Sequence, residues 1–228
     1  FSLAATAPGV LLDAGSGDIW QACRVVRGGA ERGRQHNPEF TLVEWYRLGL
    51  PMAAMAAETA AFVDALSVAG GAAPRGFETL TYRDALRRHA GVDPLDADDA
   101  ALRRAAGPLN LDPPSLAAAT RDDLLDLLVA ALGGPALGHG ALCALTHYPA
   151  SQAALARLDP ADPRLALRFE LYGDGLELAN GFEELADARE QAARFAADNA
   201  ARAARGLAPQ PVGARPLAAL DAGPPACC

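Results

Sequence analysis

The stretch RGGAERGRQHNPEFTLVEWY, residues 27–46, joins a basic, glycine-containing loop to a strand of alternating aromatic and acidic residues. A strand–loop–strand of this kind can hold a nucleotide triphosphate, because cationic side chains pair with phosphate oxygens and glycines let the backbone approach them closely. The loop offers such groups at Arg27, Arg32, Arg34 and His36. A solvated turn has the same composition, so this stretch alone leaves both interpretations open.

The segment after the loop, residues 40–46, has the β-branched and aromatic composition of a strand. Side chains alternate between the two faces of a strand, so one face carries Phe40, Leu42, Glu44 and Tyr46. We therefore predict that Glu44 and Tyr46 share a surface.

The composition limits the classes of function. The chain has 228 residues, enough for one or two domains, and a net charge of −8, with arginine as its only basic residue besides histidine. An acidic balance argues against a protein that grips a nucleic-acid backbone over a wide surface, although a local arginine cluster can bind phosphates. No uninterrupted apolar run reaches the ~18 residues of a membrane span. The four cysteines lack zinc-finger spacing, so we expect a soluble, cytoplasmic protein with reduced thiols, outside membranes.

Turn and cap residues divide the chain into elements. We predict a strand over residues 18–26, a helix from Pro51 to Gly70, a helical insertion over about 75–134, a strand over 141–148, and a last helix over about 187–205. Helices inserted between runs of adjacent strands favour an α+β domain built on an antiparallel sheet.

Cap residues mark the starts of the helices inside the insertion. Thr81 with Asp84 resembles a capping box, and Thr120 with Asp123 resembles another. Asp96 is the predicted cap of the helical segment that ends at Gly107. The insertion carries no residues that we assign to chemistry.

A carboxylate pair lies on a predicted hairpin, RFELYGDGLEL, at residues 168–178. A two-residue turn, at Gly173-Asp174 or Asp174-Gly175, puts Glu170 and Glu177 on the same face, and the first of these registers puts them directly opposite each other. Like charges in such positions destabilise a sheet unless a cation lies between them, and Mg²⁺ prefers oxygen ligands of this kind. Two glutamates on a solvated face are the alternative.

Asn180 and Glu184 follow on the same strand and beyond it. Strict alternation puts both on the face opposite Glu177, so they can join its site only through a bulge. Gly181 is the position that we predict for this bulge.

Three blocks together resemble the elongation factor P lysine ligases, which are tRNA-independent relatives of the class II lysyl-tRNA synthetases. The blocks are HNPEFTLVEWYR at 36–47, YPASQAALAR at 148–157 and RFELYGDGLELANGFEELADAREQ at 168–191. The details EWYR and YPASQ resemble the ligases, whereas true synthetases tend to carry MELY and HPAE. The resemblance implies a class II synthetase-like antiparallel sheet flanked by helices, which spans residues 1–228.

The resemblance also implies an ATP-dependent ligase that uses Mg²⁺. A lysine or (R)-β-lysine carboxylate attacks the α-phosphate of ATP, and the resulting adenylate passes its acyl group to a lysine side chain of elongation factor P. On the ATP side, Arg27 matches the catalytic arginine that neutralises the α-phosphate, His36 a histidine near the phosphates, and Phe40 the ring that stacks on adenine. Glu170 and Glu177 match the carboxylates that bind magnesium and ATP.

On the substrate side, Glu44 and Tyr46 match the pair that contacts the amines, and Asn180 and Glu184 match the contacts to the substrate carboxylate and ammonium. The resemblance further implies a homodimer when the protein is full length, and no tRNA substrate. A catalytic domain of a lysyl-tRNA synthetase is one alternative, and an inactive nucleotide-binding paralogue or fragment is another.

The chain departs from the family pattern in three places. A TSPE segment is absent near residues 3–5, the loop at 27–31 is one residue longer, and the family's first and third motifs fall before residue 1 and after residue 228. We therefore expect a catalytic domain that is incomplete at both ends, so that the activity of this fragment alone stays open.

Overall fold

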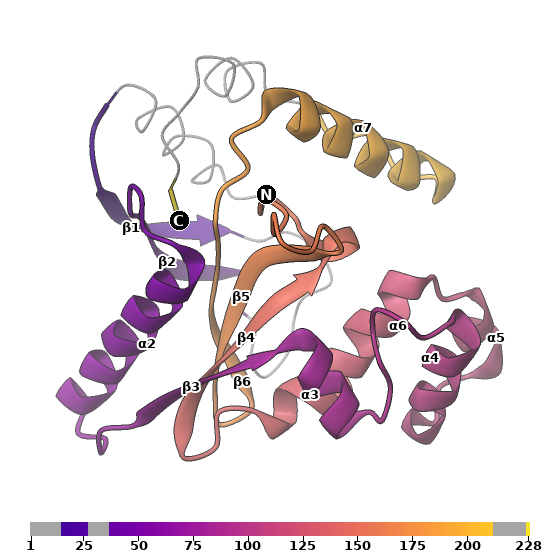
Figure 1. Cartoon of the computed structure of the whole chain (residues 1–228), viewed down its shortest axis with the longest axis horizontal. Coiled ribbons are helices and arrows are strands. Elements are labelled where there is room, and N and C mark those ends of the chain that lie inside the picture. The colour runs from indigo at the N-terminus through magenta and orange to yellow at the C-terminus, as the bar shows by residue number, and fades with distance from the viewer. Residues whose placement is uncertain (1–14, 27–36, 212–226) are drawn as a thin grey trace. The chain divides into compact units, whose positions relative to one another are not determined.

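The computed structural model describes residues 15–26, 37–211 and 227–228. The chain divides into two compact units (Figure 1). The first unit comprises Phe1–Leu50 and Glu184–Cys228, and the second comprises Pro51–Glu183. Arg27 and His36 lie outside the described residues.

The first unit contains an antiparallel pair of strands, β1 (Ile19–Val26) and β2 (Glu39–Tyr46). The two predicted strands are thereby confirmed to within one residue. The face of β2 that carries residues 40, 42, 44 and 46 is half-buried, whereas residues 39, 41 and 43 are exposed. A helix, α7 (Ala188–Ala204), also belongs to this unit and begins at the N-cap Asp187, which accepts hydrogen bonds from the backbone of residues 189 and 190.

The second unit contains a four-stranded sheet in the order β3-β4-β5-β6. The strands are β3 (Gly76–Thr81), β4 (Ala141–Pro149), β5 (Leu165–Gly173) and β6 (Leu176–Phe182). β4, β5 and β6 pair antiparallel, and β3 joins β4 in parallel. The expected α+β architecture is therefore confirmed, with one parallel strand at the edge.

Helices flank this sheet (Figure 1), and they come both before and after β3 in the sequence. They are α2 (Met52–Ala69), α3 (Tyr82–His89), α4 (Asp99–Ala106), α5 (Pro113–Ala118) and α6 (Arg121–Leu128), with short helical turns η2 (Gly107–Leu109), η3 (Val129–Gly133), η4 (Gly134–Ala136) and η5 (Ala150–Gln152). The predicted helical insertion over 75–134 is wrong at its start, because residues 76–81 form β3. Their backbone groups pair with β4 instead of with one another.

The caps confirm two of the three predicted helix starts. Thr81 accepts a hydrogen bond from the backbone of Asp84, and Thr120 forms a complete capping box with Asp123. Asp96 does not cap α4, because Asp98 occupies the N-cap and accepts from the Ala101 backbone at 2.7 Å. The Asp96 carboxylate instead pairs with arginine side chains of the same unit.

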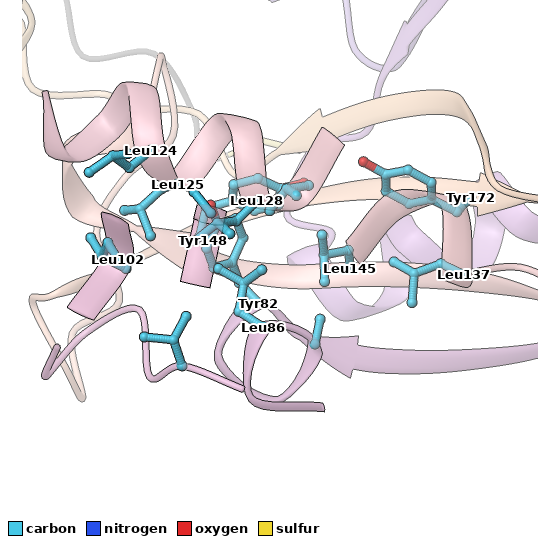
Figure 2. Close-up of a cluster of buried hydrophobic side chains, with 14 of the residues drawn as sticks. Tyr82, Leu86, Leu102, Leu124, Leu125, Leu128, Leu137, Leu145, Tyr148 and Tyr172 are labelled. Carbon is cyan, nitrogen blue, oxygen red and sulfur yellow. The ribbon is translucent and has the colours of Figure 1, made fainter. Parts of the chain in front are cut away.

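The main hydrophobic core lies where α3, α4 and α6 pack against β4 and β5 (Figure 2). Leucines of the helices fill it, and the rings of Tyr82 and Tyr148 lie side by side with centroids 4.8 Å apart. Tyr172 of β5 closes the other end of this core next to Leu137 (Figure 2). The helical insertion is therefore built onto the face of the sheet that carries Tyr172.

Among the described residues, α2 is the one helix long and apolar enough to cross a membrane by length and composition, a test that core helices also pass. α2 contains Glu58 and Asp64. Its first half buries Met52, Met55 and Ala60, and the helix packs against β5 and β6. α2 therefore forms part of the core of the second unit.

Candidate functional site

The β5–β6 hairpin turns at Asp174 and Gly175, which both have positive φ, 52° and 76°. Two such residues make the turn type that matches the twist of a two-residue hairpin, and aspartate followed by glycine is a favoured pair for it. Of the two predicted turns, the structure thus has the second. Tyr172 then lies opposite Glu177, and Glu170 lies opposite Asn180. Glu170 and Glu177 share a face, but the register that puts them directly opposite each other is wrong.

A bulge in β6 brings Asn180 to the same face. The partners of Leu171 and Tyr172 are Ala179 and Glu177, so Leu178 is the additional residue. The bulge reverses the alternation beyond it, and Asn180 therefore joins the face of Glu170 and Glu177. The predicted position at Gly181 is wrong, because this glycine pairs regularly with Phe169. A Cβ atom at Gly181 would lie 2.6 Å from the Phe169 ring, so packing accounts for the glycine.

Both oxygens of the buried Glu170 carboxylate accept a hydrogen bond. Oε1 accepts from Nη2 of Arg168 at 2.6 Å, and Oε2 accepts from the Tyr172 hydroxyl at 2.7 Å. Burial, followed by the nearby charges of Glu170 and Glu177, raises the pKa of Tyr172, so this hydroxyl stays a donor. The two donors, Arg168 and Tyr172, compensate the charge of Glu170 and fix the direction of the lone pairs that remain free on its oxygens.

Three groups hold Arg168 itself. Its guanidinium carbon lies 4.4 Å from the centre of the Tyr148 ring, and Nη1 donates to the backbone oxygen of Gln152 at 2.8 Å. Arginine can make all three contacts at once, because its planar guanidinium stacks on a ring while its N–H groups donate to different acceptors. No sequence pattern singles Arg168 or Tyr172 out, because each reads as an ordinary strand residue.

In the first unit, polar and acidic groups gather at the end of β2. Gln21 of β1 lies opposite Glu44 and donates its amide to the Glu44 carboxylate. Burial, Glu184 and Glu44 all raise the pKa of Tyr46, in that order of importance. The prediction that Glu44 and Tyr46 share a face is confirmed, and Glu184 is the third member of the group.

Glu184 is the least compensated of these groups. Burial raises the pKa of its carboxyl to about 8. A carboxyl with such a pKa is largely protonated at neutral pH, and a cation nearby would restore its charge. This arrangement suits an ammonium ligand better than an anion.

Cys227 lies beside this group and has no counterpart in the sequence predictions. It forms an antiparallel bridge with Leu48, and its carbonyl accepts from the Glu184 backbone at 2.9 Å. Burial and the charge of Glu184 raise the pKa of its thiol to about 12. The buried, neutral thiol thus lies near Tyr46 and Glu184, a position that depends on pairing between distant segments.

The remaining predicted residues stand as follows. Phe40 lies opposite Val25 on the same half-buried face of β2 as Glu44. Arg27 and His36 lie outside the described residues, so their positions stay predictions.

Within the part of the chain that the structure describes, no cluster of three or more histidine, cysteine or acidic side chains could hold a metal ion. Mg²⁺ in nucleotide sites needs only one or two carboxylates, because substrate phosphates and water complete its ligands. The shared face of Glu170 and Glu177 fits this smaller donor set.

Residues 9–208 match the family model described as tRNA synthetases class II (D, K and N). The match covers most of the chain, and it agrees with the antiparallel strands, the flanking helices and the carboxylate-bearing hairpin. The chain therefore belongs to this family of class II synthetases.

Within that family, the chain is similar to proteins named "Elongation factor P--(R)-beta-lysine ligase". It is 46% identical to that of Enterobacter sp. (strain 638) over 94% of this chain and 64% of the relative. It is 46% identical to that of Klebsiella pneumoniae (strain 342) over 95% of this chain and 65% of the relative. For the protein of Erwinia tasmaniensis the values are 47%, 94% and 64%. The chain thus spans just under two thirds of the length of these relatives.

Proposed function

We propose that this chain is the core of an ATP-dependent ligase that activates lysine or (R)-β-lysine and transfers it to a lysine side chain of elongation factor P. The identity of 46% to ligases of this name over 94% of the chain carries the proposal. The shared face of Glu170, Glu177 and Asn180 and the acidic group around Tyr46 support it, because the reaction needs metal ligands and ammonium ligands.

On the ATP side, Glu170 and Glu177 would hold Mg²⁺ together with the phosphates, and Phe40 would stack on adenine. Arg27 neutralises the charge that builds on the α-phosphate, and His36 contacts the phosphates. The lysine carboxylate oxygen attacks the α-phosphorus, and the bond to pyrophosphate breaks. The chemistry that Mg²⁺ supplies when bound is charge neutralisation on the phosphate oxygens.

On the substrate side, Glu44, Tyr46 and Glu184 receive the ammonium groups, and Asn180 contacts the substrate carboxylate. An ammonium next to Glu184 favours its charged form, so binding of the substrate and ionisation of this carboxyl stabilise each other. In the second half-reaction, the amine of the acceptor lysine attacks the acyl carbon and AMP leaves with the electron pair of the broken bond.

The proposal includes elongation factor P as partner, a homodimer for the full-length protein, a cytoplasmic location, and no role for tRNA. The names of the relatives support the acceptor and the amino acid.

The test is the intact mass of elongation factor P after incubation with Mg²⁺-ATP, (R)-β-lysine and protein that spans the full length of the relatives. A parallel tube contains lysine tRNA instead of the factor. We expect a mass gain on the factor and no charged tRNA. Charged tRNA with an unmodified factor would instead identify a lysyl-tRNA synthetase, and no product in either tube would identify an inactive paralogue.

A further inference from the structure

We propose that Arg168 is a positioning residue for the Glu170 carboxylate, and that the helical insertion holds Arg168 in place through η5. This inference rests on the proposed function, since it assigns a task to the contacts around a proposed metal ligand. It also gives the insertion, which carries no chemistry by sequence, a role in the reaction.

The ion pair between Arg168 and Glu170 is largely enclosed by the protein. The side chains of Arg168 and Glu170 are 17% and 10% exposed, so water screens their interaction little. Arg168 and Tyr172 flank Glu170 at alternate positions of β5 and therefore lie on its face of the sheet. Each donates to a different oxygen of the carboxylate. The plane of the carboxylate is thereby fixed before any ligand binds.

The second step is the fixation of Arg168. Its Nη1 donates to the Gln152 backbone oxygen, and its guanidinium stacks on Tyr148. Because these anchors lie on η5 and β4, rotation of the Arg168 side chain away from Glu170 would break contacts to both. Groups that orient metal ligands in this way are worth about 10-fold to 100-fold in metal affinity or activity.

The third step connects η5 to the insertion. The Gln152 side chain donates to Asp126 of α6 at 2.7 Å, and Ser151 donates to Asp122 of α6 at 2.6 Å. Ser151 and Gln152 belong to the YPASQ block that distinguishes the ligases from the synthetases by sequence. In this structure both side chains of the block tie α6 to the segment that anchors Arg168.

Two backbone hydrogen bonds hold the turn of the β5–β6 hairpin. The backbone of Asp174 donates to Gly138, and that of Gly175 donates to Leu137, both at 2.9 Å. A Cβ atom at Gly138 would lie 2.5 Å from the Tyr172 backbone oxygen, so only glycine permits this approach. The segment between the insertion and β4 thus holds the hairpin at its turn, and the insertion acts through Arg168 beside Glu170.

The experiment is a double-mutant cycle in protein that spans the full length of the relatives. The variants are Arg168→Met, Glu170→Gln and the combination of both. The measurements are the rate of ATP–pyrophosphate exchange, the Mg²⁺ concentration at half-maximal rate, and Tm. Arg164→Met is the matched control, because Arg164 also pairs with a carboxylate, Asp162 at 2.7 Å, but on an exposed loop.

We expect Arg168→Met to slow exchange about 10-fold and to raise the required Mg²⁺ concentration. In the Glu170→Gln background it should cause no additional loss of rate, because Arg168 acts through Glu170. Arg168→Lys, which keeps the charge but lacks the planar fork, should restore part of the rate. Arg164→Met should leave the rate and the Mg²⁺ requirement unchanged.

Losses of rate that multiply in the double variant would overturn the inference. So would an Arg168→Met protein with a lower Tm but an unchanged Mg²⁺ requirement. If Arg168→Met fails to fold, Arg168→Lys takes its place in the cycle.

If the wild type lacks exchange activity, the proposed function fails, and the affinity for Mn²⁺-ATP, measured by electron paramagnetic resonance, replaces the rate in the same cycle. No binding of Mn²⁺-ATP by the wild type would overturn the inference as well.

Discussion

Glu170 and Glu184 are both proposed ligand-binding carboxyls, but their surroundings differ. Glu170 accepts hydrogen bonds from Arg168 and from Tyr172, so its charge is compensated within the protein. Burial raises the pKa of Glu184 to about 8, and no described cation lowers it. On the proposed assignments, we infer two modes of preparation: Glu170 is fixed in place before a metal ion binds, and Glu184 becomes charged when a cationic substrate binds.

The largest effect should come from Glu184→Gln. Removal of one partner from a buried carboxylate–ammonium pair costs about 2–5 kcal/mol, so we expect the KM for the amino acid to rise about 100-fold. Steady-state pyrophosphate exchange at varied lysine or (R)-β-lysine concentration measures it. The neighbouring Glu183 provides the matched control, because its carboxylate binds Arg157 and the Met52 backbone. Glu183→Gln should therefore lower Tm and leave KM unchanged, and equal KM values for both variants would contradict the distinction.

Gly181→Ala tests the packing of the hairpin that carries Glu170. The new methyl group would meet the Phe169 ring, which is buried, so we expect a loss of about 2 kcal/mol in the free energy of unfolding. Urea unfolding measures this change. Gly107→Ala is the control, since nothing lies within 4 Å of a Cβ atom there. A Gly181→Ala protein as stable as this control would show that the ring relaxes freely.

The pH dependence of stability tests the raised pKa of Glu184. The pKa of Glu184 is higher in the folded protein than its ordinary value of 4.5, so the folded state binds more protons between pH 4.5 and 8. Stability from this group is therefore present at low pH and declines as pH rises to about 8. One pKa unit corresponds to about 1.4 kcal/mol. Thermal unfolding across this range should show a flatter profile for Glu184→Gln than for the wild type, and parallel profiles would exclude the raised pKa.

The smallest effect should come from Tyr172→Phe, which removes one of the two donors to Glu170. One hydrogen bond to a charged group contributes about 1.5–3 kcal/mol at most when both partners are buried. Because Arg168 remains, we expect a rise of only about 3-fold in the Mg²⁺ concentration at half-maximal exchange, equal to about 0.7 kcal/mol. An effect as large as that of Arg168→Met would mean that the hydroxyl, and not the guanidinium, fixes the carboxylate.

Local signals predicted most of the fold. Strand alternation predicted β2 and its shared face, and cap residues predicted α3 and α6. The short β3 was missed because its strand character depends on pairing with β4, 65 residues further along the chain. Asp96 was predicted as the cap from its residue type, but Asp98 is the N-cap, and Asp96 instead pairs with Arg83 and Arg164.

For the candidate site, the sequence predicted which residues carry charge, but not which donors or cations in the fold compensate each charge. Alternation alone required a bulge to bring Asn180 to the face of Glu177, and a bulge is present, at Leu178. No local pattern distinguishes Leu178 from Gly181 as the position of this bulge, whereas the pairing of β5 with β6 does. The contacts of Arg168 and Cys227 likewise arise from segments that the fold brings together.

The most direct test of the difference between the two carboxyls is the number of protons released when (R)-β-lysine binds at pH 7. Calorimetry in two buffers of different ionisation enthalpy measures this number. We predict a release of up to about one proton per site for the wild type, because the ammonium restores the charge of Glu184, and none for Glu184→Gln. Binding without proton release by the wild type, or with the same release by both proteins, would contradict the account.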